Sequence, residues 1–310
     1  MLFQMRRIRF FITLLKPRVM SLAIYTSFIG IVLAPGHIGL FKGIVSIIAI
    51  SIGAGASGAL NMYYDADIDQ IMTRTSSRPI PMGKIAPWEA LIFGLFLAIC
   101  SIIIMGLAIN EIAALLLFLS IFCYILVYTI WLKRLTPQNI VIGGISGAIP
   151  PMIGWASVTG GISIECFIMF LIIFLWTPPH FWSLALLYKD DYAMANIPML
   201  PNVVTDRATK IHILVYTILT AIAGLLPTIL GFASIVFYGS TVCFLGYYFI
   251  LGALRAAFFS NEDNNTLFIR KIFAISLVYL FALFSILMID HLVEAKAVDR
   301  YIMSGLSEIF

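Results

Sequence analysis

The chain consists of apolar runs of about 20 residues, separated by short polar segments. A helix of that length spans the hydrocarbon core of a bilayer. Because backbone polar groups in lipid need internal partners, such runs favour helices. The pattern therefore predicts an all-α, polytopic membrane protein with nine spans. We place them at about residues 19–37, 43–63, 89–109, 112–131, 140–158, 165–188, 212–231, 235–256 and 272–290.

The distribution of basic residues supports this span count. With the N-terminus in the cytoplasm, all but three of the 19 Lys and Arg residues fall on the cytoplasmic side, the exceptions being Lys42, Lys296 and Arg300. Basic residues favour that side of a membrane protein, whereas eight or ten spans would put later loops on the wrong side. We therefore expect a periplasmic C-terminus, a basic cytoplasmic head at residues 1–18 and a short tail at residues 291–310. The whole chain, residues 1–310, is expected to form a single intramembrane domain.

Composition excludes several other classes of protein. Hydrophobic residues make up 62% of the chain and charged residues 11%, against about 25% charged residues in a typical soluble domain. The net charge of +4 is small and spread along the chain, so we expect no nucleic-acid partner. The four cysteines lie in apolar runs without the spacing of a disulfide framework or zinc site. The basic head has no small-residue cleavage site and is short for an organelle transit peptide, which favours the bacterial cytoplasmic (inner) membrane.

Residues 57–84 form the first polar cluster, directly after the second apolar run. Asn61, Asp65 and Asp69 are spaced four apart, so on a helix they share one face, and Asp67 points away from it. Like charges at this spacing repel, and a bound cation relieves the repulsion. Carboxylate oxygens beside a substrate phosphate suit Mg²⁺, so the stripe predicts a magnesium site. The alternative interpretation is a solvated loop.

Basic residues follow this cluster and recur after the fourth span. Arg74 and Arg78 suit phosphate oxygens. Lys133 and Arg134 lie at the end of the fourth span, where they either anchor the topology or contact the same anion. Pro150–Pro151 is expected to break the fifth helix, and broken membrane helices are tolerated where they line a cavity.

The sixth span carries the second group of candidate residues. Pro178–Pro179 is expected to interrupt this span, and His180 follows at once, with Trp176 and Trp182 nearby. A single histidine among aromatic residues is either a packed, hydrogen-bonded residue or a substrate contact. At the end of the span, Lys189, Asp190 and Asp191 form a second acidic segment.

With both acidic segments in view, the chain is identified as a member of the UbiA-type intramembrane prenyltransferase superfamily, and it is similar to the branch that farnesylates haem. The resemblance runs over about residues 15–290 and rests on specific motifs. They are Lys16-Pro17-Arg18, residues 61–79 with Arg74-Thr75 and Arg78-Pro79, Leu132-Lys133-Arg134 with Thr136 and Asn139, residues 141–151, Thr177-Pro178-Pro179-His180-Phe181-Trp182, and Met199-Leu200-Pro201.

The resemblance implies nine helices around a central cavity and Mg²⁺-dependent transfer of farnesyl from farnesyl diphosphate to a vinyl group of haem B, giving haem O for a terminal oxidase. It implies a metal site at Asp65, Asp69, Asp191 and Asp190. It implies diphosphate contacts from Asn61, Arg74, Arg78, Lys133, Arg134 and Lys189, with Lys133 and the acids Asp65, Asp69 and Asp191 catalytic. Haem contacts would come from His180, Trp176 and Trp182. Implied partners are the lipid bilayer and haem A synthase or terminal oxidase assembly proteins.

One departure from the superfamily concerns the second acidic segment, which often has two Asp residues four apart. Here Ala195 lies four residues after Asp191, and Asp190 would face about 100° away on a helix. Two alternatives follow: Asp191, with Asp190, holds a second ion, or it orients the first. Lys189 is a candidate for the missing positive charge.

Two other functions remain open from the sequence. Prenylation of an aromatic quinone precursor such as 4-hydroxybenzoate would use the same acidic motif, but it needs a narrower cavity than a haem. A secondary transporter also has broken helices, but its charges lie near mid-membrane, whereas these acids lie at the span ends.

Overall fold

The computed structural model describes residues 2–260 and 264–294. Within these ranges all regular structure is helical, which confirms the predicted all-α class. The predicted tail from residue 295 onward, with Lys296 and Arg300, lies outside the described residues.

Eight helical segments of the described chain are long and apolar enough to cross a membrane. They are Leu40–Tyr64, Pro87–Ala108, Glu111–Leu132, Asn139–Thr159, Ile164–Leu187, Asp206–Ile229, Ile235–Phe258 and Asn265–Leu292. The first predicted span falls on Pro17–Leu33, which qualifies only together with Arg7–Leu14, and the two are bent by 51°. The described residues thus contain eight of the nine predicted spans, or all nine if this bent pair counts as one.

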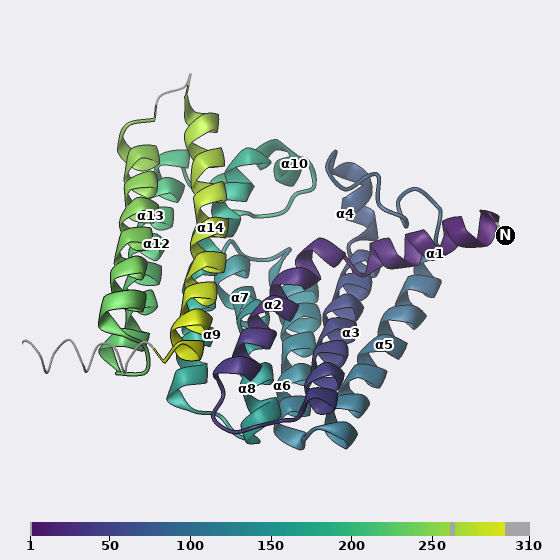
Figure 1. Ribbon diagram of the computed structural model, residues 1–310. Helices are drawn as coiled ribbons and strands as arrows, with labels where there is room; N and C mark the ends of the chain where they lie inside the picture. Colours follow the sequence, from purple (N-terminus) through teal and green to yellow (C-terminus); the bar gives the residue numbers. More distant parts are fainter. Residues whose placement is uncertain (1, 261–263, 295–310) are drawn as a thin grey trace, which may run out of the picture. The chain divides into compact units, whose positions relative to one another are not determined.

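The chain divides into two compact units, Met1–Ile162 with Tyr188–Val203, and Ser163–Leu187 with Val204–Phe310 (Figure 1). The first unit contains α1 (Leu2–Leu14), α2 (Pro17–Leu33), α3 (Leu40–Tyr64), α4 (Ala66–Ile71), α5 (Pro87–Ala108), α6 (Glu111–Phe122), the π-helix η1 (Cys123–Leu132), α7 (Asn139–Ala148), α8 (Pro150–Thr159), α10 (Lys189–Met194) and α11 (Leu200–Val203). The second contains α9 (Ile164–Leu187), α12 (Asp206–Ile229), the π-helix η2 (Ile235–Gly239), α13 (Ser240–Phe258) and α14 (Asn265–Leu292).

In the first unit, glycine allows α2 and α8 to approach closely. A Cβ added at Gly154 would lie 2.0 Å from the Ser27 carbonyl oxygen, and one added at Gly30 would lie 2.2 Å from the Pro151 carbonyl oxygen. The Ser27 hydroxyl donates a hydrogen bond to the Pro150 carbonyl oxygen at 2.9 Å. Small residues of this kind let membrane helices pack backbone to backbone.

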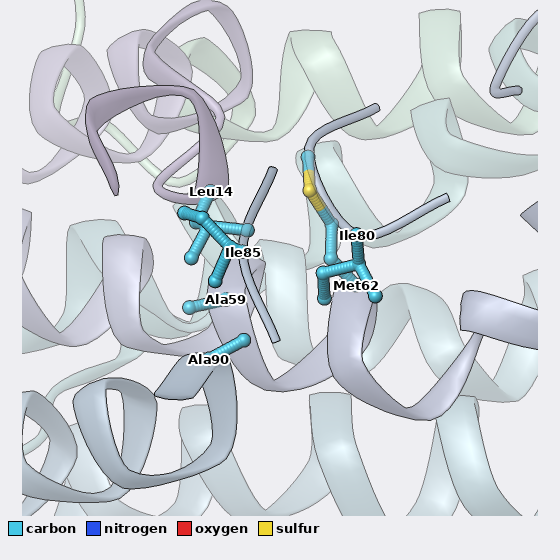
Figure 2. Close-up of a cluster of buried hydrophobic side chains, with 6 residues drawn as sticks. All are labelled: Leu14, Ala59, Met62, Ile80, Ile85 and Ala90. Atoms are coloured by element: carbon cyan, nitrogen blue, oxygen red, sulfur yellow. The ribbon is translucent and has the colours of Figure 1, made fainter. Parts of the chain in front are cut away.

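A buried apolar cluster fixes the segment that follows α4. Figure 2 shows its members, which come from the end of α1, from α3, from the loop between α4 and α5, and from the start of α5: Leu14, Ala59, Met62, Ile80, Ile85 and Ala90. Full burial of a large aliphatic side chain contributes about 1.5–3 kcal/mol. The cluster therefore holds the loop that carries the predicted arginines against the end of α3.

The two proline pairs behave differently. α7 ends at Ala148 and α8 begins at Pro150, so the predicted break in the fifth span is confirmed. The predicted interruption at Pro178–Pro179 is wrong, because α9 runs unbroken from Ile164 to Leu187 with both prolines inside it. Membrane helices tolerate proline where Ser and Thr side chains and neighbouring helices serve the freed backbone groups. Pro178 and Pro179 free the carbonyls of Phe174 and Leu175, four residues earlier, whereas Thr177 and Ser183 donate to other carbonyls, those of Ile173 and Pro179. Packing of α9 against α12 and α14 therefore supports the helix here.

In the second unit, α9 packs against both α12 and α14. A buried polar contact joins η2 to α14, where the Asp290 carboxylate accepts hydrogen bonds from the Ser234 backbone N–H and hydroxyl. The four cysteines of the chain are all free, as predicted.

Candidate active site

The acidic stripe lies where α3 ends and α4 begins. Asp65 sits between the two helices, and the turns continue across it, since its N–H donates to the Asn61 carbonyl and its own carbonyl accepts from the Asp69 N–H. Asn61, Asp65 and Asp69 are buried, at 3%, 0% and 2% exposure. The side chain of Asp67 is 62% exposed. The predicted geometry, with three residues on one face and Asp67 off it, is therefore confirmed.

The two buried carboxylates of the stripe are each paired with a cation. Lys133 Nζ lies 2.5 Å from Asp65 Oδ2, and Arg78 Nη1 lies 2.6 Å and 2.8 Å from the two oxygens of Asp69. The Asn61 amide donates to Asp65 Oδ2 at 2.8 Å. These cations relieve the repulsion between the two carboxylates, which is the effect that we expected of a bound cation.

The exposed carboxylate has its own partner. Both Arg134 Nη atoms donate to Asp67, at 2.7 Å and 2.8 Å, and the guanidinium stacks over the Tyr64 ring at 4.9 Å. The hydrogen bonds from Arg134 hold the pKa of Asp67 below its usual value. Lys133 and Arg134, although adjacent, therefore serve opposite sides of the acidic segment, and only Lys133 reaches the buried stripe.

The π-helix η1 brings Lys133 to the stripe. Its wider turns show in the backbone, where the Lys133 N–H bonds the Tyr128 carbonyl five residues earlier at 2.9 Å. Thr129 Oγ1 likewise donates to the Tyr124 carbonyl and accepts from the Asn61 amide at 3.0 Å. π-Helical turns are often found at functional sites. No pattern in the sequence indicates this turn, so Thr129 was not predicted as part of the site.

Lys16 is a second residue whose place in the site was not predicted. It lies in the bend between α1 and α2 with a left-handed backbone, φ 52°, and its amine donates to Asn61 Oδ1. The bend rests on Gly58, where an added Cβ would lie 3.0 Å from the carbonyl oxygens of Leu14 and Leu15. Burial, with Arg78 nearby, lowers the pKa of the Lys16 amine to about 7. The available signal was a basic residue directly before the proline that begins a span.

The second acidic segment meets the loop that follows the first. Asp191 accepts the backbone N–H groups of Thr73 and Arg74, at 3.3 Å and 3.1 Å. The Arg74 guanidinium donates to the Tyr192 hydroxyl at 3.1 Å and lies over the rings of Tyr188 and Tyr192. The structure thus brings together Asp191 and Arg74, which lie 117 residues apart in the sequence.

The neighbours of Asp191 lie differently. Asp191 is buried, Asp190 is exposed and Lys189 is partly buried. This matches the expectation that Asp190 and Asp191 face different directions on a helix. Because the backbone N–H groups of Thr73 and Arg74 bond Asp191, this carboxylate joins α10 to the loop that follows α4.

The residues around Asp65 fit a hard cation. Asp65 Oδ1 is buried and has no hydrogen-bond partner among the described residues. An unpaired buried carboxylate oxygen is costly, and oxygen is the donor that Mg²⁺ prefers. No group of three or more His, Cys, Asp or Glu side chains in the described part of the chain forms a complete metal site. Mg²⁺ bound together with a substrate phosphate needs only one or two carboxylates from a protein.

His180 lies in the second unit, between α9 and α14. Its ring stacks on Trp176, with centroids 4.3 Å apart, and on Phe273, at 4.7 Å. Its Nδ1 lies 2.8 Å from the Ser276 hydroxyl. Trp182 contacts a different helix, since its ring packs edge-on against two aromatic residues of α12, His212 and Tyr216. The structure brings Trp176 and His180 together and separates Trp182 from them.

Comparisons with known proteins identify the family of this chain. Residues 23–288 match the model of the UbiA prenyltransferase family. The chain is 56% identical over 291 residues to the protoheme IX farnesyltransferase of Sinorhizobium fredii, covering 94% of this chain and 91% of that protein. It is 56% identical over 283 residues to the protoheme IX farnesyltransferase of Rhizobium meliloti, covering 91% and 89%.

Solved structures share the fold at low sequence identity. A digeranylgeranylglyceryl phosphate synthase aligns with a TM-score of 0.75 at 17% identity, covering 92% of this chain and 99% of that one. A UbiA homologue from Archaeoglobus fulgidus, solved with DMAPP and Mg²⁺ bound, aligns with a TM-score of 0.60 at 16% identity, covering 89% and 99%. With a paired acidic stripe at the end of a membrane helix, and a family match over most of its length, this chain belongs to the UbiA prenyltransferase family of integral membrane enzymes.

Proposed function

We propose that this enzyme transfers the farnesyl group of farnesyl diphosphate to a vinyl carbon of haem B, giving haem O. The observation that carries the proposal is the 56% identity, over 94% of the chain, to a protoheme IX farnesyltransferase. The buried stripe of Asn61, Asp65 and Asp69, with its attached cations, supplies the matching chemistry.

The stripe would hold Mg²⁺ on the diphosphate. Asp65 is the proposed main ligand because its Oδ1 is buried without a hydrogen-bond partner among the described residues. Asp69, one helical turn further on, is the proposed second ligand. Bound there, Mg²⁺ would neutralise charge on the diphosphate oxygens. Asp191, with Asp190, is the candidate for a second ion or for orienting the first.

The basic residues would stabilise the departing diphosphate. Lys133 bonds Asp65 and Arg78 bonds Asp69. With these acids holding the metal, both cations would be free to contact diphosphate oxygens. Arg74, Arg134 and Lys189 are further proposed anion contacts. As the carbon–oxygen bond of farnesyl diphosphate breaks, negative charge collects on the leaving group, where fixed cations are most effective.

The carbon centre needs no protein nucleophile. The allylic cation left on the farnesyl chain is attacked by the electron pair of the haem vinyl group, and aromatic ring faces stabilise such cations. The attack leaves a cation on the vinyl carbon next to the macrocycle, and a water molecule adds there and loses a proton, giving the hydroxyethyl group of haem O. Exclusion of water delays premature quenching. The aromatic group of Trp176 and His180 is the proposed haem contact within the second unit. Trp182, which packs on α12, is a separate proposed contact.

We propose that the enzyme lies in the bacterial cytoplasmic (inner) membrane with its N-terminus in the cytoplasm and its C-terminus in the periplasm. The basic-residue distribution supports this orientation. The acidic stripe would then face the cytoplasm, where farnesyl diphosphate is soluble. Haem A synthase or terminal oxidase assembly proteins are the proposed recipients of haem O.

The test is mass spectrometry of haems extracted from a host lacking its own haem-farnesylating enzyme, with and without this protein. We expect haem O only when the protein is present. A prenylated quinone precursor in place of haem O would refute the proposed acceptor.

A further inference from the structure

Ser276 of α14 is fully buried beside His180 and makes two contacts through one hydroxyl group. Its Oγ lies 2.8 Å from His180 Nδ1 and 2.7 Å from the Phe273 carbonyl oxygen of its own helix. A serine hydroxyl carries one hydrogen and two lone pairs. The acceptor to which this single hydrogen is donated decides which nitrogen of the neutral histidine ring carries the proton.

The carbonyl contact assigns that hydrogen. A carbonyl oxygen can only accept, so the 2.7 Å contact with the Phe273 carbonyl is a hydrogen bond only if the Ser276 hydroxyl donates to it. Were the hydrogen turned toward His180, two oxygen lone-pair regions would face each other at that distance. The Ser276 oxygen therefore accepts from His180, and the imidazole proton lies on Nδ1.

The ring is also fixed in orientation. Trp176 and Phe273 both stack on it, with interplanar angles of 19° and 24°. The Trp176 indole donates to the Ser276 backbone carbonyl at 2.7 Å, which ties this part of α9 to α14. In a neutral imidazole one nitrogen donates and the other accepts. With the proton on Nδ1, the Nε2 lone pair is the one available for ligation.

We propose that Ser276 is a positioning residue that holds His180 in the Nδ1–H tautomer, so that Nε2 ligates the iron of the substrate haem B. The inference rests on the proposed function, because it assumes that haem is the acceptor. A hydrogen bond donated by the ring nitrogen that does not bind the metal fixes the tautomer of a ligating histidine and raises its basicity. Packing of the His180 ring needs only its stacking on Trp176 and Phe273 and does not require a hydroxyl at position 276.

The test is resonance Raman spectroscopy of purified full-length protein loaded with haem B and reduced, with haem affinity measured by titration. Wild type is expected to show an iron–histidine stretching band. His180→Ala should lose the band. Ser276→Ala should shift it to lower frequency and weaken haem binding about 10- to 100-fold. Ser276→Thr, which keeps a hydroxyl, should restore both, and it also serves if the alanine variant does not fold.

Each other outcome has a definite meaning. An unchanged band in His180→Ala would show that the histidine is not the ligand and would overturn the inference. An unchanged band in Ser276→Ala, with the band lost in His180→Ala, would overturn the role of Ser276. Neither result touches the proposed reaction, which fails only if wild-type protein makes no haem O.

Discussion

Replacing Asp65 by Asn isolates the charge at the centre of the buried stripe. In the wild type, Asp65 Oδ2 accepts from both Asn61 and Lys133, whereas Oδ1 has no partner among the described residues. An asparagine can place its oxygen at the Oδ2 position and keep both hydrogen bonds. The shape is thus retained, but Lys133 loses its counterion and a buried NH₂ group has no acceptor.

The size of the effect follows from burial. Asp65 is 0% exposed and the Lys133 side chain 12% exposed. Removing one member of a buried ion pair costs about 3 kcal/mol or more. The matched control is Asp67→Asn, in the pair with Arg134, where the side chains are 62% and 31% exposed. An exposed pair contributes at most about 1 kcal/mol, so Asp67→Asn should be several-fold milder than Asp65→Asn.

Two assays separate folding from chemistry. The free energy of unfolding, measured by SDS titration in mixed micelles, should fall by about 3 kcal/mol for Asp65→Asn and little for Asp67→Asn. Haem O formed per unit of folded protein should fall at least about 100-fold for Asp65→Asn, because a charge that acts on the leaving group is lost. Equal stability losses at both positions would refute the buried-pair reasoning, and near-normal activity of Asp65→Asn would refute the metal site.

Two further predictions concern the loop contact and the orientation. Asp191→Asn removes the charged acceptor of the Thr73 and Arg74 N–H groups, so hydrogen exchange at these two amides should accelerate, and the exposed Asp190→Asn serves as control; unchanged exchange would show that Asp191 does not hold the loop. Reporter fusions active only in the periplasm should be silent after Lys84 and active after residue 293, and activity after Lys84 would reject the nine-span orientation.

Features that repeat along the chain could be predicted from the sequence. Apolar runs of membrane length specify helices because lipid offers no partner for the backbone. The four-residue spacing of Asn61, Asp65 and Asp69 specifies one face because the α-helix has 3.6 residues per turn. The same geometry placed Asp67 on the opposite side, as the structure shows. Each of these depends only on residues close together in the chain.

Local pattern failed where neighbouring helices decided the outcome. Pro178–Pro179 has the local signature of a break, but α9 continues through it, packed against α12 and α14. Lys133 and Arg134 look equivalent in sequence. Neighbouring residues on a helix face about 100° apart, but which of the two meets Asp65 and which meets Asp67 is decided only by the packing of η1 against α3.

Pairings across long stretches of sequence belong to the tertiary structure alone. The amine of Lys16 reaches Asn61, and Asp191 reaches the backbone of Thr73 and Arg74, through contacts between segments 45 to 118 residues apart. No local periodicity encodes such a contact. Its partners are fixed only when helices pack, because each buried polar group must then find a donor or acceptor among whatever side chains the packing brings near it.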